Sequence, residues 1–373
     1  MHIEPFAVEQ WMNAWETRCA FNLAETCVES LTLAELLTLA GKNEADLSAL
    51  AGIKMTYGDI RGSDRLLTAI TGLYERQSAE NLIVTHGTIG ANMLVHKSLV
   101  ERGDRVVAVV PTYQQHYSIP ASFGAEVVPL KLRAEDGYLP DLDALRALVT
   151  PGTKLIAINN PNNPTGALMD RRVLEEIAAI ARSVGAWVLC DEVYRGTDQT
   201  GNGTTTSIAD VYERGIATCG MSKAFSLAGL RLGWVAAPPE VIEAVSIHRD
   251  YDTISVGKLD DHFAALALEH ADRVLARSRR ITRGNLATLE AWIADQPRIS
   301  WVKPQSGTVT LLEVDTRLTA RAFCLKLLEE HSVMFTPGDC FDMEGTVRIG
   351  FANPPAALAE GLGRVDAFLR HVA

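Results

Sequence analysis

The chain has 373 residues, and its formal net charge of −11 argues against a nucleic-acid surface, which would normally be basic. Hydrophobic residues make up 47% and charged residues 22%, as in ordinary globular proteins, and the length predicts a large domain with a smaller one. No apolar run reaches the roughly 18–20 residues of a membrane span, so no membrane partner is expected.

The N-terminus and the cysteines indicate the cellular compartment of the protein. Residues 1–6 lack a basic region followed by an apolar stretch, so no signal peptide is expected. The cysteines are scattered without a CxxC pair, which is typical of reduced thiols and not of a disulfide framework or a zinc site. We therefore expect a cytoplasmic enzyme without a metal site.

Short apolar runs alternate with helix-like stretches through the middle of the chain. Four of these runs are bounded by turn residues: Leu82–Val84, Arg105–Val110, Leu155–Ile158 and Trp187–Cys190. Such continuous runs fit strands buried on both faces of a mostly parallel sheet, while residues 170–184 have helical spacing. The alternation predicts an α/β sheet with helices on both faces, and ligands then lie beyond the carboxyl ends of the strands.

The turn after the first of these strands, residues 85–90, contains small residues and precedes a predicted helix. There Gly87, Thr88 and Ile89 would present backbone N–H groups to a phosphate, because a helix N-terminus binds anions. Alone, a glycine-containing turn of this sort is weak evidence.

Two further strand ends carry residues suited to an aromatic ligand. Tyr113 follows the strand at 105–110 and could stack on a flat ring, although core packing is the alternative. Asn163 lies in the rigid turn 159–166 and could hydrogen-bond a ring oxygen, although turns rich in Asn and Pro are common.

The fourth strand is followed directly by Asp191, with Tyr194 three residues later. A carboxylate at this place can pair with a protonated pyridine nitrogen and make the ring an electron sink. Tyr194 could donate a hydrogen bond to the oxygen of the same ring. The alternative is that the acidic pair Asp191-Glu192 caps a helix.

The strongest local pattern is the stretch 222–233, Ser-Lys-Ala-Phe-Ser-Leu-Ala-Gly-Leu-Arg-Leu-Gly. The amine of Lys223 could form a Schiff base with an aldehyde only when deprotonated, so we expect the site to depress its pKa. Ser222 and Arg231 suit a phosphate dianion, whereas Lys258 lacks a following Arg and Gly at this spacing. The alternative is an ordinary surface loop.

From about residue 251 the pattern changes to a long helical region at 260–296, followed by strands at 308–312 and 347–351 and a last helix. We expect a smaller α+β domain here, joined by the N-terminal segment. The predicted boundaries are 41–249 for the large α/β domain and 1–40 with 250–373 for the small one.

Six residues in this order resemble the class I/II aminotransferases, which are fold type I pyridoxal-phosphate (PLP) enzymes: Tyr113, Asn163, Asp191, Tyr194, Lys223 and Arg231. The resemblance implies a mostly parallel seven-stranded sheet, PLP as a Schiff base on Lys223, and a homodimer with shared active sites. It further implies that Tyr57 reaches the partner's cofactor phosphate, and that Arg348 clamps the substrate carboxylate beside Asn163.

Three functions remain open at this point. The first is amino transfer from an L-amino acid to a 2-oxo acid, with Lys223, Asp191 and Tyr194 as catalytic residues. The second follows from residues 22–32 and 248–261, which resemble a branch that includes capreomycidine synthase and oxygen-dependent arginine oxidases. The third is an idle PLP-fold regulator, which the retained lysine and the lack of room for a DNA-binding domain disfavour.

The resemblance to that branch has a departure. Several of its members carry a histidine that acts in their unusual chemistry, whereas this chain has Cys27 and Glu29 in the segment. Oxidation or cyclisation is therefore less favoured than amino transfer, and a cationic substrate remains open. The candidate guanidinium partners are Glu25, Glu29, Asp260 and Asp261, with helix caps and solvated faces as the alternative.

Overall fold

The computed structural model describes residues 2–201 and 204–371. Its helices are α1 (Ala7–Trp15), α2 (Leu33–Leu39), α3 (Glu44–Leu50), α4 (Asp64–Thr71), α5 (Gly87–Leu99), α6 (Gln115–Phe123), α7 (Leu142–Leu148), α8 (Arg171–Val184), α9 (Ile208–Val211), α10 (Pro239–Asp250), α11 (Lys258–Glu269), α12 (Ala271–Ala294), α13 (Ala320–His331) and α14 (Pro355–Leu369). Among the described residues, no helix is both long and apolar enough to span a bilayer.

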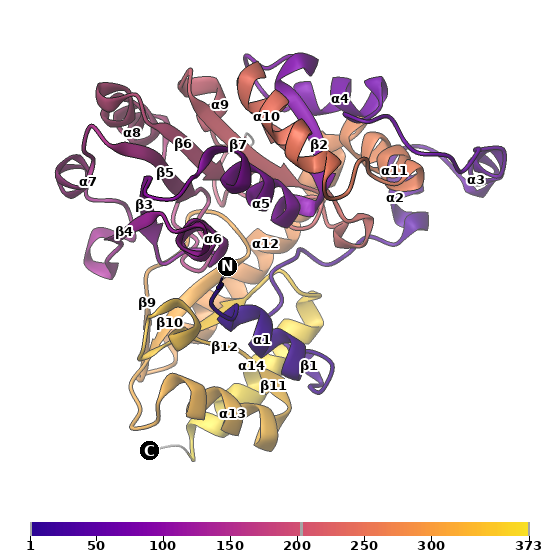
Figure 1. Ribbon diagram of the computed structural model, residues 1–373. Coiled ribbons are helices and arrows are strands. Elements are labelled where there is room, and N and C mark those ends of the chain that lie inside the picture. The colour runs from indigo at the N-terminus through magenta and orange to yellow at the C-terminus, as the bar shows by residue number, and fades with distance from the viewer. Residues whose placement is uncertain (1, 202–203, 372–373) are drawn as a thin grey trace.

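A seven-stranded sheet forms the centre of the larger unit (Figure 1). Its strands, in spatial order, are β2 (Leu82–His86), β8 (Leu232–Ala236), β7 (Gly215–Gly220), β6 (Trp187–Asp191), β5 (Thr153–Asn159), β3 (Arg105–Val110) and β4 (Glu126–Lys131). Strand β8 runs antiparallel to both neighbours, and every other neighbouring pair is parallel. The expected α/β fold with a mostly parallel seven-stranded sheet is confirmed.

Helices cover both faces of this sheet, which explains its continuous apolar strands. In β2, Leu82 and Val84 pack into the core under α4, α8 and α11, whereas Ile83 packs into the opposite core under α5 and α10. Val106 and Val107 divide between the two cores in the same way. Successive side chains of a strand point to opposite faces, so both sets of positions must be apolar.

The smaller unit contains a four-stranded antiparallel sheet with the order β12 (Thr336–Pro337), β13 (Thr346–Gly350), β10 (Val309–Val314) and β9 (Ile299–Trp301). Its core is closed by α1, α13, α14 and the second half of α12. The N-terminal segment joins it through β1 (Phe21–Asn22), which pairs in parallel with β11 (Val333–Met334).

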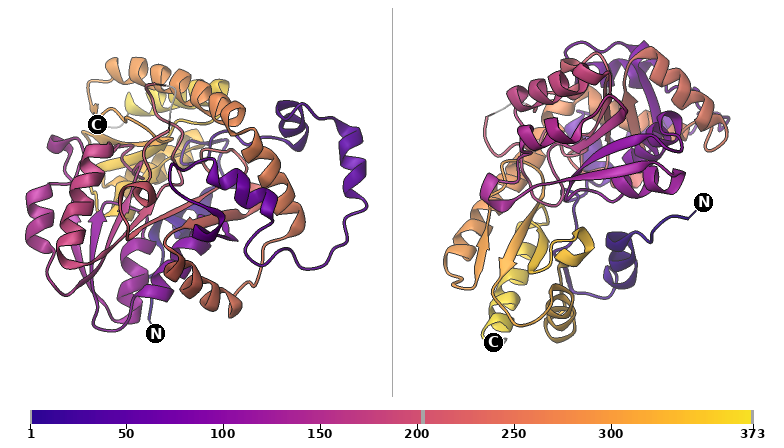
Figure 2. Two further views of the ribbon diagram at one scale, coloured as in Figure 1. Left: turned by 90° about the horizontal axis from the view of Figure 1, so that it is seen from above. Right: turned by 60° about the vertical axis from the view of Figure 1, so that its left-hand side comes forward.

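The helical region expected at 260–296 is two helices, because the chain breaks at His270 between α11 and α12. Helix α12 then joins the two cores: Leu275 packs under the large sheet and Leu289 under the small one. The domain boundaries at 41 and 249 stay a prediction, and both α2 and α11 contribute side chains to the large core. Figure 2 shows α3 standing away from the main body.

Candidate active site

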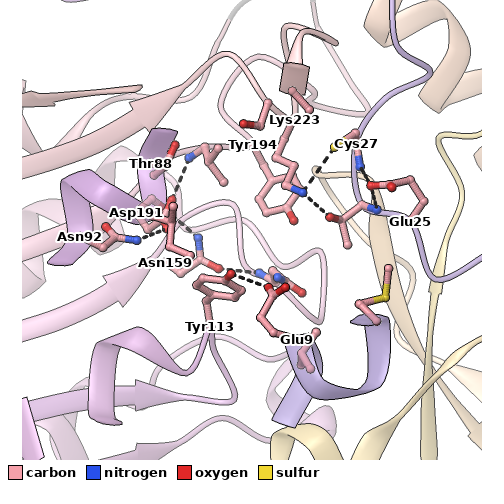
Figure 3. Close-up of a pocket in the computed structure, with 18 of the residues that line it drawn as sticks. Glu9, Glu25, Cys27, Thr88, Asn92, Tyr113, Asn159, Asp191, Tyr194 and Lys223 are labelled. Carbon is pink, nitrogen blue, oxygen red and sulfur yellow. Dashed lines mark hydrogen bonds between the residues drawn. The ribbon is translucent and has the colours of Figure 1, made fainter. Parts of the chain in front are cut away.

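A cavity of about 310 Å³ lies beyond the carboxyl ends of the large sheet, between that sheet and the smaller unit. One side, here called the strand-end wall, presents Thr88, Asn92, Tyr113, Asn163, Asp191, Tyr194 and Lys223. The other side, here called the N-terminal wall, presents Glu9, Met12, Glu16, Glu25, Thr26 and Cys27, together with Arg348 from β13. Figure 3 shows the two walls facing each other across the cavity.

Asp191 ends β6 and is held in one orientation by its neighbours. The residue is 4% exposed; Oδ2 accepts a hydrogen bond from Asn92 Nδ2 at 2.8 Å, and Oδ1 accepts from the Val193 N–H at 3.0 Å. His116 Nε2 lies 3.8 Å from Oδ2 on the buried side. A buried carboxylate fixed by such bonds is well placed to face a cationic nitrogen.

The other acid of the pair has a structural role. Glu192 Oε1 accepts hydrogen bonds from Ser207 Oγ at 2.9 Å and from the Ile208 N–H at 2.8 Å, and so caps the start of α9. The helix-cap alternative therefore holds for Glu192, and the pairing of Asp191 with a ring nitrogen stays a prediction.

Lys223 reaches across the cavity toward the N-terminal wall (Figure 3). Its Nζ donates to Thr26 Oγ1 at 2.5 Å and to Cys27 Sγ at 3.4 Å. Burial acts to lower the pKa of Lys223, but Cys27, Tyr194 and Glu25 outweigh burial and hold this pKa above its usual value. The expectation of a depressed pKa is thus wrong for the protein groups alone, because an acidic turn lies against the amine.

Gly87 and Arg231, two of the residues predicted to bind the phosphate, come together where β2 meets α5. Gly87 has φ +69°, and a Cβ there would lie 3.1 Å from Nη2 of Arg231, which itself has φ +46°. This left-handed backbone favours glycine, and it brings the guanidinium beside the N-terminus of the helix. Among the described residues, the buried hydroxyl of Thr88 has no hydrogen-bond partner. Ser222 and Ile89 line the same cavity.

Arg348 projects from β13 toward the strand-end wall. It is 2% exposed, donates from Nη1 to Asn163 Oδ1 at 3.0 Å, and donates from Nη2 to the carbonyl of Ala24 at 3.1 Å. Burial lowers the pKa of its guanidinium. Asn163 therefore lies beside Arg348, and their role in holding a substrate carboxylate stays a prediction.

Tyr113 is oriented by the first helix. Its hydroxyl donates to Glu9 Oε1 at 2.7 Å, and its ring contacts Phe6 at a centroid distance of 4.6 Å. The ring lines the cavity, as a stacking residue would. Burial, and then the charge of Glu9, raise the pKa of this phenol, so Tyr113 remains the hydrogen-bond donor.

Several residues that line the cavity were not predicted from the sequence. Glu9 and Met12 on α1 and Glu16 at its C-cap are spaced so that they lie on one helical face, but nothing in the sequence directs that face to the cavity. Asn92 could have been found, because it lies four residues after Thr88 and thus on the same side of α5.

Most of the four candidate guanidinium partners, and also Tyr57, do not line the cavity. Glu29 pairs with Arg277 at 3.6 Å, and Asp261 Oδ2 accepts from the Ser63 N–H at 2.9 Å. Asp260 and Asp261 both lie in the first turn of α11. Of the four candidate guanidinium partners, Glu25 lines the cavity. Tyr57 is 76% exposed and is not among the residues that line this cavity.

Residues 29–365 match the family "Aminotransferase class I and II", and the chain belongs to this family. Capreomycidine synthase from Streptomyces vinaceus is 29% identical over 96% of this chain and 92% of the relative. Arginine–pyruvate transaminase AruH from Pseudomonas aeruginosa is 28% identical over 86% of this chain and 84% of the relative.

Solved structures extend the comparison. A PLP-dependent aminotransferase from Streptococcus suis superimposes with a TM-score of 0.97 at 43% identity, covering 100% of this chain and 99% of that one. The PLP-dependent cyclase OrfR gives a TM-score of 0.91 at 28% identity, covering 99% and 98%. Aminotransferases and a cyclase are therefore both similar to this chain.

The cofactor of this family is pyridoxal phosphate, and the residues present fit it. The unpartnered Thr88 hydroxyl, the open Gly87 turn and Arg231 form a cradle for a phosphate at the start of α5. The buried Asp191 carboxylate and the Lys223 amine open into the same cavity. These groups match a ligand with a phosphate, a basic ring nitrogen and an aldehyde.

Proposed function

We propose that the protein is an aminotransferase that moves the amino group of an L-amino acid to a 2-oxo acid, with Lys223 as the cofactor-binding lysine and base. One observation carries this proposal: Lys223, Asp191 and Arg348 open into a single cavity from three separate elements. Amino transfer needs these three groups, namely a base, an acid that keeps the cofactor ring charged, and a clamp for the carboxylate.

Each residue then has one task. Arg348 holds the substrate carboxylate through its fork of donors, with Asn163 beside it. Asp191 would hold the protonated ring nitrogen of the cofactor, which when bound would supply an electron sink for the electron pair left by the α-proton. Lys223 takes the α-proton after its amine is released, and Tyr194 lies within the same cavity to orient the ring. Ser222, Arg231 and the turn at Gly87 hold the phosphate.

A second candidate is a PLP enzyme of arginine metabolism that oxidises its substrate, eliminates a group from it or closes it into a ring. The acidic N-terminal wall supports a cationic substrate, because Glu9, Glu16 and Glu25 all line the cavity. Two relatives bear names from this chemistry, capreomycidine synthase and arginine–pyruvate transaminase. The second of these is itself a transaminase, so a cationic donor is compatible with amino transfer.

Cys27 favours amino transfer over the second candidate. It lies 3.4 Å from Lys223 Nζ, in the segment where several members of the arginine branch carry a histidine. Burial raises the pKa of Cys27 to about 11, so the thiol does not exchange a proton near neutral pH as an imidazole does.

The deciding experiment supplies the cofactor-loaded protein with single L-amino acids and no 2-oxo acid. Amino transfer releases one 2-oxo acid per active site and stops, and adding a 2-oxo acid acceptor restores turnover. Continued turnover without an acceptor, accompanied by oxygen uptake, would reject amino transfer in favour of the second candidate. L-Arginine, L-lysine and L-aspartate together test whether the donor is cationic.

We also propose that the protein works as a homodimer in which Tyr57 reaches the partner's cofactor phosphate. The support is that Tyr57 and Met55 are 76% and 70% exposed, although both are large apolar side chains. Analytical ultracentrifugation of the loaded protein gives the test. A monomer at working concentration would contradict this assembly.

A further inference from the structure

The N-terminal segment from Phe21 to Val28 crosses the site and is fixed along its length. The carbonyl of Leu23 accepts from the Gly350 N–H at 2.7 Å, and the carbonyl of Thr26 accepts from Thr308 Oγ1 at 2.6 Å. The Val28 N–H reaches the Lys223 carbonyl at 3.4 Å. The segment thus bridges the small sheet and the loop that carries Lys223.

Gly350 shows how closely this segment is packed. A Cβ at Gly350 would lie 1.8 Å from the carbonyl oxygen of Glu25, so no side chain fits between β13 and the segment. Ala24, the preceding residue, accepts from Arg348 Nη2 through its carbonyl. The turn that follows is therefore held in register with the arginine that we assign to the substrate carboxylate.

The same turn receives the amine of Lys223. Thr26 Oγ1 accepts from Nζ at 2.5 Å and Cys27 Sγ lies at 3.4 Å. Glu25 folds back to brace the turn, because its Oε1 accepts from the N–H groups of Thr26 and Cys27 at 2.7 and 2.8 Å. Tyr194 lines the same cavity as this turn.

We propose that the turn Glu25-Thr26-Cys27 is the docking position of the Lys223 amine whenever that amine is not bonded to the cofactor. Thr26 is the positioning residue, and Glu25 both braces the turn and places a negative charge beside the amine. This role rests on the proposed use of Lys223 as the base of amino transfer. The docked amine is held as an ammonium, which must lose a proton to solvent before the amine can attack the cofactor's aldehyde or take the α-proton.

The groups around the amine support this state, and Glu25 is the one that carries a negative charge near neutral pH, because burial raises the pKa of Cys27 and of Tyr194. Glu25 and Cys27 on the N-terminal segment and Tyr194 beyond β6 raise the pKa of Lys223 against the effect of burial. Lys223 in turn lowers the pKa of Glu25, which burial alone would raise. Other charged groups that line the same cavity are Asp191, Arg231 and Arg348, together with Glu9 on α1 and Glu16 at its C-cap. Loss of the Glu25 charge or of the Thr26 acceptor must therefore lower the amine pKa.

The test uses the full-length chain cleared of cofactor and then mixed with PLP. The rate at which the visible band of the lysine-bound cofactor forms is measured against pH for Thr26→Ser, Thr26→Val and Glu25→Gln. Thr38→Val and Glu101→Gln, two exposed positions, are the matched controls. The band forms without amino-acid turnover, so failure of amino transfer does not affect this measurement.

We expect the rate–pH curve to move to lower pH by about 1–3 units in Glu25→Gln, because a neighbouring opposite charge shifts a pKa by that amount. Thr26→Val moves it in the same direction by about one unit, equivalent to an about tenfold faster rate at a given low pH. Thr26→Ser keeps the wild-type curve. General structural damage would slow band formation and leave the curve's position unchanged.

Unchanged curves in both Glu25→Gln and Thr26→Val would overturn the proposal. A Thr26→Ser curve displaced as far as that of Thr26→Val would overturn it too, since the hydroxyl would then not be the docking group. If Thr26→Val does not fold, Thr26→Ala replaces it and is judged by the same displacement. Thermal unfolding of each variant identifies the folded ones.

Discussion

The two walls of the cavity are built in different ways. The strand-end wall takes its residues from the carboxyl ends of the strands of one sheet and from the loops and helix that follow them, as with Asp191 at the end of β6 and Thr88 on α5. The N-terminal wall is assembled from α1 and the turn at Glu25, which lie near each other in sequence, and from strand β13, more than 300 residues later. The first wall fits the cofactor, and we propose that the second selects and holds the substrate.

We infer that relatives with different reactions share the strand-end wall and differ in the N-terminal wall. Aminotransferases and a cyclase superimpose on the whole chain, so one strand-end architecture serves several reactions. A wall made from a terminal helix and a short turn can change residues without disturbing the sheet. Variants on each wall should therefore affect different quantities.

The largest effect is expected from Lys223→Ala on the strand-end wall. The variant loses the visible band of the lysine-bound cofactor and at least about 1000-fold in turnover, because both the covalent link and the base are gone. The phosphate cradle is untouched, so PLP should still bind, as equilibrium dialysis can measure. An unchanged visible spectrum would contradict the assignment of Lys223.

Arg348→Lys should raise the KM for the amino acid by about 10- to 100-fold, because an ammonium lacks the fork that binds a carboxylate and leaves Asn163 without its partner. Steady-state kinetics with a fixed acceptor give the measurement. Arg171→Lys, an exposed pair with Glu75, is the matched control. An equal rise in KM in Arg348→Lys and Arg171→Lys would contradict a role for Arg348 in binding the substrate.

Glu9→Gln tests whether the N-terminal wall selects charge. Glutamine can still accept from Tyr113, so the ring should keep its place while the negative charge is lost. The ratio of kcat/KM for L-arginine to that for a neutral donor should fall about tenfold. If kcat/KM falls equally for both donors, Glu9 has a structural role and does not select charge. Glu44→Gln on α3 is the control.

The smallest effect concerns stability behind the strand-end wall. Burial, and then His116, lower the pKa of His96 well below its usual value, so the folded protein keeps this ring neutral. The unfolded chain takes up the proton near pH 6.5, and stability is lost as pH falls below that value, by up to about 1.4 kcal/mol per unit. In urea titrations, the free energy of unfolding of His96→Phe should fall less between pH 6.5 and 5.5 than that of the wild-type protein. An unchanged slope would exclude His96 as the source.

The sequence predicted the strand-end wall well because its signals are local. An apolar run followed by Asp191, or a lysine followed at fixed spacing by Arg231, is visible within a dozen residues. The pKa of Lys223 was predicted in the wrong direction, because its partners Glu25 and Cys27 lie almost 200 residues away in the chain. Glu9 and Thr26 could not be assigned for the same reason, since tertiary packing alone brings α1 and the turn to the cavity.

The central claim is that the cofactor is bonded to Lys223, where the two walls meet. Reduction of the loaded protein with borohydride fixes the cofactor on its lysine, and peptide mass mapping then locates it. We predict a single modified peptide that contains Lys223, and none in Lys223→Ala. Modification of Lys258 or of another lysine in the wild-type protein would contradict the account.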